Sequence, residues 1–174
     1  MQDKTKTLSL AIALLTFVLY LLPIPHDSVG IYNAGPWWGR WTYSLFHASI
    51  FHWLVNCWCL LSLVFYMGVT ARQLLTSYII ASLFPVATLY GLCGAHILTI
   101  PTTGLSGVCY ALIGMVTPQV ARKREWLTWL AVGFAVSCIF PLINQFVHIW
   151  GFIVGLGIGY LLNARRSSTN TTRE

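Results

Sequence analysis

The chain has 174 residues, of which 57% are apolar and 8% are charged, and its formal net charge is +6. Soluble globular proteins carry about 25% charged residues, so this composition excludes a soluble protein and indicates an integral membrane protein without room for a soluble domain. The basic residues lie mainly in loops between apolar segments. The positive charge therefore predicts contact with the lipid bilayer and its anionic headgroups, and gives no indication of a nucleic-acid partner.

Six apolar segments approach or reach the roughly 17–25 residues that a helix needs to cross a bilayer. In chain order they cover residues 7–22, 50–69, 74–95, 104–120, 126–143 and 147–162. The first segment lacks a small-residue cleavage site, so we expect a retained helix and not a signal peptide. The sequence therefore predicts an all-α protein, a polytopic bundle of six transmembrane helices over residues 1–163. Residues 164–174 are polar, and we expect a disordered, exposed cytoplasmic tail there.

The basic residues predict the orientation of this bundle. If the N-terminus lies in the cytoplasm, six crossings place every Lys and Arg except Arg40 on the cytoplasmic side. This bias follows the positive-inside rule, so we expect both termini in the cytoplasm. The small size and the charge bias together favour a prokaryotic cytoplasmic (inner) membrane.

The longest connection, residues 23–49, lies on the outer side in this topology. It contains a group of ring side chains: Trp37, Trp38, Trp41, Tyr43, Phe46 and His47. Such residues favour the membrane–water interface. The connection is therefore expected either to lie partly in the outer leaflet or to form an aromatic belt with no further role.

Two features point to a cavity near Ser106. Pro85 is expected to kink the third segment. Residues 96–103 then return to membrane depth, where irregular backbone is tolerated only beside protein or a water-filled cavity. This stretch therefore predicts a cavity just ahead of Ser106.

His52 and Asn56 are polar residues within the second apolar segment. They are four residues apart and so share one helix face. Polar side chains at membrane depth are costly unless they meet partners, so one interpretation is a pair that is hydrogen-bonded to another helix. The other is an oxyanion hole, because an Asn amide and a His N–H are suitable donors to a developing oxyanion.

Ser106 and His148 are a candidate nucleophile and base at membrane depth. Ser106 opens the fourth segment within Gly-x-Ser-Gly, and His148 opens the sixth. Each is followed by small residues on one helix face: Gly107, Ala111 and Gly114 after Ser106, and Gly151, Gly155 and Gly159 after His148. Such faces let helix backbones pack closely, so we expect Ser106 Oγ within hydrogen-bond reach of His148. A glycine repeat alone more often indicates packing without chemistry.

The few carboxylates limit the possible mechanisms. The chain has four, and none lies within an apolar segment: Asp3, Asp27, Glu125 and Glu174. An intramembrane aspartyl protease needs two such Asp residues and a zinc protease needs an HExxH-type helix, so both are excluded and no metal or other cofactor is expected. A channel or transporter that relies on intramembrane acids is also disfavoured. A Ser-His dyad remains, since Asp27 would be the sole candidate for a third member and lies outside the bundle.

At this point three sequence blocks resemble the rhomboid intramembrane serine proteases: residues 47–56, 104–111 and 148–155, in this order on six predicted spans. The resemblance implies roles for individual residues. Ser106 would be the nucleophile and His148 the general base. Asn56, His52 and the Ser106 backbone N–H would form the oxyanion hole. Tyr110 would pack against the His148 ring and, with Gly104, line the substrate site.

The resemblance also implies the function. The protein would cleave single-span transmembrane substrates near the outer interface, with the fifth helix as a movable gate and residues 140–143 as its hinge and cap. The family usually has Trp-Arg in the first loop, whereas here Gly39 separates Trp38 from Arg40. The alternative is a non-proteolytic rhomboid-like binding protein or chaperone, which has no need of an intact Ser106 and His148.

Overall fold

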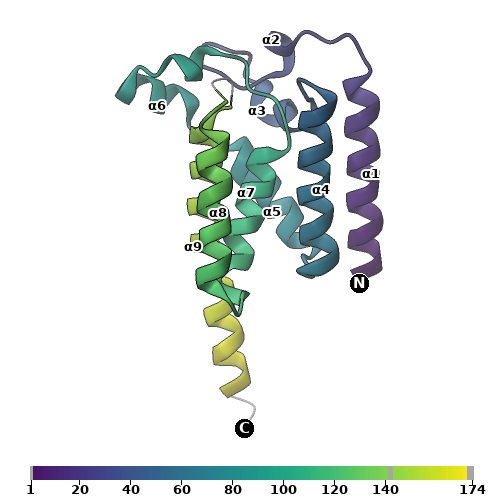
Figure 1. Cartoon of the computed structure of the whole chain (residues 1–174), viewed down its shortest axis with the longest axis vertical. Coiled ribbons are helices and arrows are strands. Elements are labelled where there is room, and N and C mark those ends of the chain that lie inside the picture. The colour runs from purple at the N-terminus through teal and green to yellow at the C-terminus, as the bar shows by residue number, and fades with distance from the viewer. Residues whose placement is uncertain (1, 141–142, 172–174) are drawn as a thin grey trace.

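Helices account for nearly all the regular structure of this protein. The computed structural model describes residues 2–140 and 143–171 (Figure 1). Within them the α-helices are α1 (Gln2–Tyr20), α2 (His26–Val29), α3 (Gly39–Thr42), α4 (Ile50–Tyr66), α5 (Ala71–Ser82), α6 (Val86–Cys93), α7 (Ser106–Val116), α8 (Lys123–Ser137) and α9 (Gln145–Thr171). Short 3₁₀ turns are η1 (Tyr43–Leu45), η2 (His96–Thr99) and η3 (Thr117–Gln119). The prediction of an all-α protein is confirmed.

The predicted count of six spans is not confirmed by helix length. Among the described helices, α9 over Gln145–Ala164 is the one that is both long and apolar enough to cross a membrane. Two bent pairs raise the count to three if each is one span: Gly39–Leu45 with Ile50–Tyr66, bent by 91°, and α5 with α6, bent by 43°. The fourth predicted segment, 104–120, contains the 11-residue helix α7 and ends in the 3₁₀ turn η3.

Several helix ends follow local signals in the sequence. Ser49 caps α4 by accepting a hydrogen bond from the His52 backbone N–H at 3.2 Å. Thr70 and Gln73 form a reciprocal capping box at the start of α5. The break between α5 and α6 falls at Pro85, which lacks a backbone N–H, so the predicted kink is confirmed. Helix α9 continues to Thr171, so the predicted disorder after residue 163 is wrong up to there, because no Gly or Pro stops the helix.

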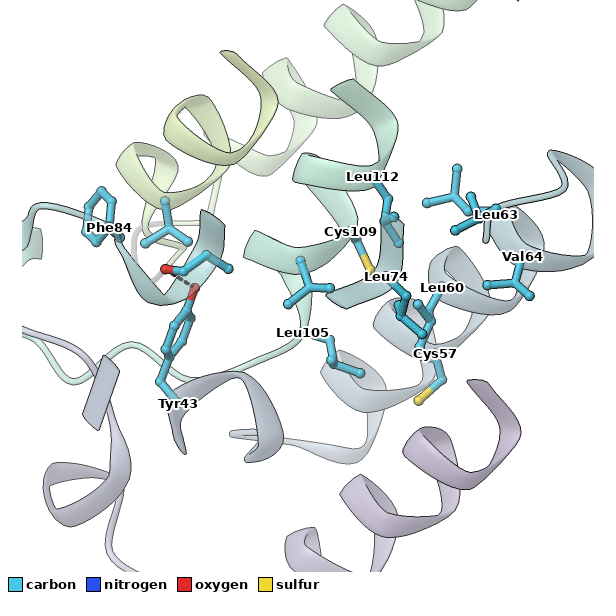
Figure 2. Close-up of a cluster of buried hydrophobic side chains, with 14 of the residues drawn as sticks. Tyr43, Cys57, Leu60, Leu63, Val64, Leu74, Phe84, Leu105, Cys109 and Leu112 are labelled. Atoms are coloured by element: carbon cyan, nitrogen blue, oxygen red, sulfur yellow. Dashed lines mark hydrogen bonds between the residues drawn. The ribbon is translucent and has the colours of Figure 1, made fainter. Parts of the chain in front are cut away.

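The apolar core lies between α4, α5 and α7 (Figure 2). Its buried side chains include Cys57, Leu60, Leu63, Val64, Leu74, Leu105, Cys109 and Leu112. Helix α1 packs against α4 through a polar contact as well: Trp53 Nε1 donates to Thr16 Oγ1 at 3.1 Å. Many large apolar side chains are exposed on the outside of these helices, as expected for a surface that faces lipid.

The two ends of the bundle carry different connections. The start of α1 and the far end of α9 lie toward the same end of the molecule (Figure 1). The α4–α5 connection is also there, because Lys6 Nζ lies 5.4 Å from the Phe65 ring centroid and Gln2 approaches Gly68. The opposite end carries α2, α3 and α6 and the loop that leads to α7.

The first connection does not behave as one aromatic belt. Trp37, Trp38 and Trp41 are exposed, in line with the prediction. Tyr43 and His47, in contrast, are buried, as is Phe46. The connection folds back onto the bundle: the Tyr43 hydroxyl donates to the Ala81 carbonyl of α5, and His47 Nε2 accepts from the Leu105 N–H. An antiparallel bridge between Ile31 and Thr102 ties it to the loop before α7.

Candidate active site

Helices α7 and α9 lie side by side and run in the same direction (Figure 1). Their glycine-containing faces meet in register: Gly151 lies against Gly107, Gly155 against Ala111 and Gly159 against the backbone of Met115. A Cβ atom added at Gly151 would lie 2.7 Å from the Gly107 carbonyl oxygen, which leaves no room for a side chain. The predicted close contact of the two glycine-containing faces is confirmed. It places the first turns of both helices, which hold Ser106 and His148, at the same end of the pair.

The His148 ring is held against α7 by an aromatic contact. The rings of Tyr110 and His148 stack with centroids 4.3 Å apart and an interplanar angle of 13°. Ser106 is four residues before Tyr110 on α7, so the two share one face of that helix. His148 is buried, whereas Ser106 is half-buried and so remains accessible.

Ser106 Oγ and His148 make no hydrogen bond to each other among the described residues. The predicted proximity therefore holds for the two helix turns, but the predicted bond itself is not formed. Catalytic hydrogen bonds are often long or poorly aligned in unliganded enzymes and tighten when substrate binds.

Gly104 brings the loop before Ser106 close to α4. Its φ is +127°, which side-chain-bearing residues rarely adopt. A Cβ atom there would lie 2.5 Å from His52 Cε1 and 3.3 Å from Asn56 Nδ2. His52 also lies close enough to His148 for an electrostatic interaction. The structure therefore gathers Gly104, His52, Asn56 and His148 around the start of α7.

The Asn56 amide is the clearest unmet hydrogen-bonding group at this place. Asn56 is 5% exposed, and its Nδ2 has no hydrogen-bond partner in the part of the chain that the structure describes. A buried donor without an acceptor costs about 1–3 kcal/mol. A bound oxygen atom would satisfy it. The first N–H groups of α7, beginning with Ser106, also lack intrahelical acceptors and lie at the same site.

The loop ahead of Ser106 is supported by the first connection. The Leu105 N–H donates to His47 Nε2 at 3.3 Å, and the Gly104 N–H donates to the Tyr43 carbonyl at 2.8 Å. The Tyr43 hydroxyl in turn donates to the Ala81 carbonyl at 3.1 Å (Figure 2). From the sequence, His47 and Tyr43 were predicted at the membrane interface, and this support could not be predicted because the partners are distant in the chain.

A second residue that the sequence analysis missed is Gln145. Its Oε1 lies 3.3 Å from His148 Nδ1. The available signal was a polar residue three positions before His148, on the same face of a helix. The predicted hinge and cap, 140–143, lies partly outside the described residues, since 141 and 142 are not among them. The described residues contain no group of three His, Cys, Asp or Glu side chains that could hold a metal ion.

The chain is similar to a known protein family. A family model described as a Rhomboid domain matches residues 34–165, which is more than half of the chain and includes every candidate site residue. No curated protein matches the chain.

Proposed function

The chain belongs to the rhomboid family of intramembrane proteases, and from this premise we propose that it is an active serine endopeptidase that cleaves single-span transmembrane proteins. The observation that carries the proposal is the parallel α7–α9 pair. It brings the first turns with Ser106 and His148 to the same end, where Tyr110 stacks on the His148 ring at 4.3 Å. A binding protein has no need of a serine, a buried histidine and an unpartnered amide at one point.

The proposed reaction starts with attack of Ser106 Oγ on the scissile carbonyl carbon. His148 Nε2 takes the hydroxyl proton as the new C–O bond forms. The carbonyl oxygen becomes an oxyanion, which accepts hydrogen bonds from Asn56 Nδ2, the Ser106 N–H and His52. The C–N bond then breaks, and His148 gives the proton to the departing amine. This leaves an ester between Ser106 Oγ and the acyl carbon of the substrate's N-terminal fragment, while the C-terminal fragment departs with the free amine.

The second half of the reaction regenerates the enzyme. His148 takes a proton from a water molecule as its oxygen attacks the ester carbonyl, and the same donors hold the second oxyanion. The C–O bond to Ser106 breaks, and His148 returns the proton to Ser106 Oγ. The half-buried position of Ser106 at the start of a short helix supports access for this water.

We further propose six crossings with both termini in the cytoplasm. The α1 start, the α4–α5 connection and the far end of α9 share one end of the molecule, which supports an even number of crossings (Figure 1). Lys4, Lys6 and Arg72 lie at that end and Arg40 at the other, as the positive-inside rule requires. The site then lies near the outer face of a prokaryotic inner membrane.

The activity is tested with purified protein in liposomes that contain a labelled single-span substrate. We expect cleavage by the wild type and by the control Ser77→Ala, and none by Ser106→Ala or His148→Ala. Equal cleavage by Ser106→Ala would refute the assigned nucleophile. Saturable binding of several substrates without any cleavage by the wild type would instead favour the non-proteolytic binding protein.

The orientation is tested with native cysteines. Cys93, at the end of α6, is exposed, as is Cys138. A membrane-impermeant maleimide should label a Cys138→Ser variant in intact cells through Cys93, and labelling should fall when Cys93 is also replaced by serine. Labelling of Cys93 that appears only after the membrane is permeabilised would reverse the proposed orientation.

A further inference from the structure

Gln145 joins the end of α8 to the His148 ring. Its Oε1 lies 3.3 Å from His148 Nδ1, and the Ser137 hydroxyl lies 3.1 Å from the same oxygen. Gln145 and His148 are both in the first turn of α9, three residues apart on one face. Ser137 is the last residue of α8. One amide oxygen therefore contacts both a residue on another helix and the Nδ1 atom of the His148 imidazole.

A histidine that acts as a base needs an unprotonated nitrogen that faces its proton donor. A neutral imidazole carries its proton on either Nδ1 or Nε2, and the hydrogen-bond partner of one nitrogen decides the state of the other. An oxygen acceptor beside Nδ1 requires the proton there, which leaves the Nε2 lone pair free. In the serine-protease triad a buried carboxylate does this work. The chain has four side-chain carboxylates, and none of the three that the structure describes, Asp3, Asp27 and Glu125, interacts with His148.

We propose that Gln145 is a positioning residue that holds His148 in the tautomer with its proton on Nδ1, so that Nε2 can take the Ser106 proton. A neutral amide would thus replace the carboxylate of a triad. The inference rests on the proposed function, in which His148 is the base. Tyr110 and His52, the other titratable groups that interact with His148, do not fix the tautomer: Tyr110 contacts it by ring stacking and His52 through an electrostatic interaction.

The orientation of the Gln145 side-chain amide decides which tautomer of His148 it stabilises. The Ser137 hydroxyl also contacts the Phe134 carbonyl at 2.7 Å, so its proton is shared between two acceptors. An amide turned by half a rotation would place Nε2 beside both Ser137 Oγ and His148 Nδ1. It would then donate to His148 Nδ1 and force the ring proton onto Nε2, the state that cannot accept a proton from Ser106. The two orientations therefore predict opposite tautomers, which can be measured.

The test uses three full-length variants. Gln145→Met keeps the length of the side chain and removes the acceptor, whereas Gln145→Glu keeps an oxygen beside Nδ1. Ser137→Ala removes the second contact of Oε1 and leaves the contact with His148. For Gln145→Met we expect a kcat roughly 10–100-fold below the wild type, the range found for hydrogen-bond partners of metal-binding histidines, with KM changed by less than about twofold. Gln145→Glu and Ser137→Ala should stay within about fivefold of the wild-type kcat.

A spectroscopic measurement separates positioning from a general loss of structure. Nitrogen-15 NMR of histidine-labelled protein in detergent, at about pH 8, reports which ring nitrogen carries the proton in a neutral histidine. His148 signals are assigned by their loss in His148→Phe. We expect the Nδ1–H tautomer in the wild type and a mixture in Gln145→Met, with the original state restored in Gln145→Glu.

The outcomes distinguish this inference from the proposed function. The inference would be overturned if His148 in the wild type carried its proton on Nε2. It would also be overturned if the wild type were active and Gln145→Met had the same kcat and the same His148 tautomer. A wild type that cleaves no substrate would overturn the proposed function. In that case the tautomer measurement would still decide whether Gln145 positions the ring.

Discussion

Replacing Gly151 with alanine should push α9 away from α7. The added Cβ atom would lie 2.7 Å from the Gly107 carbonyl oxygen and 3.2 Å from the Ala111 nitrogen. Both are backbone atoms, which cannot rotate out of the way. Ordinary van der Waals contact begins at 3.4 Å, so the helices must separate by the difference of about 0.7 Å at this point. Gly151 is one turn from His148, and the separation should therefore reach the site.

The control for this substitution is Gly157→Ala on the same helix. Gly157 has no heavy atom within 4 Å of an added Cβ, so alanine there changes helix propensity without a clash. The difference in stability between the two variants then measures the cost of the clash between α7 and α9 alone. Overpacking costs about 1–3 kcal/mol, which corresponds to a difference in Tm of roughly 2–12 °C for a chain of this size. A misplacement of about 1 Å can lower kcat by about 100-fold, so we expect a loss of roughly 10–100-fold.

The assay compares the two variants in kcat for a labelled transmembrane substrate in liposomes and in Tm in detergent. Gly151→Ala should be lower in both quantities. If it matched Gly157→Ala in stability, the close contact of α7 and α9 would be wrong. If it matched in kcat but not in Tm, the contact would hold, but the spacing of the two helices would not control the site.

Three other substitutions test the support of the site. Gly104→Ala should abolish cleavage, because it combines a disfavoured φ of +127° with a clash against the His52 ring. A cleavage rate reduced by less than about tenfold would contradict this prediction. Asn56→Leu should lower kcat by about 100–1,000-fold, because the oxyanion loses a donor. Its Tm should stay unchanged or rise, because the substitution removes a buried donor without a partner. A large drop in Tm would show that Asn56 has a structural partner. His47→Phe should lower Tm, since the Leu105 N–H loses its acceptor at a cost of about 1–3 kcal/mol, and an unchanged Tm would show that this bond contributes nothing.

The parts of the site that follow helix periodicity could be predicted from the sequence. The four-residue repeat of Gly151, Gly155 and Gly159 predicted the face of α9 that packs closely, and α7 does meet that face. The spacing of His52 and Asn56 likewise predicted one shared face, and both side chains approach Gly104. In each case a short-range rule was sufficient, because residues three or four apart on a helix are neighbours whatever the tertiary structure is.

The rest depended on contacts between distant segments. His47 was predicted at the membrane interface, but it is buried because it accepts a hydrogen bond from Leu105, 58 residues later. No local pattern encodes such a pairing. The segment 104–120 was predicted as one span from its apolar content, which does not show that the helix begins only at Ser106 and ends at Val116. Hydropathy measures the preference of a segment for lipid, not its backbone conformation.

The four-residue spacing of the α7–α9 interface also leaves its register degenerate. A slide of α9 by one turn, about 6 Å, would set Gly155 opposite Gly107 and Gly159 opposite Ala111, so most of the close packing would survive. Two directional bonds break this degeneracy: Asn144 Nδ2 donates to Thr102 Oγ1 at 2.9 Å, and Trp150 Nε1 donates to the Ile80 carbonyl at 2.8 Å. Close packing thus stabilises the helix pair, while the two polar contacts determine the register that brings His148 and Ser106 to the same end of it.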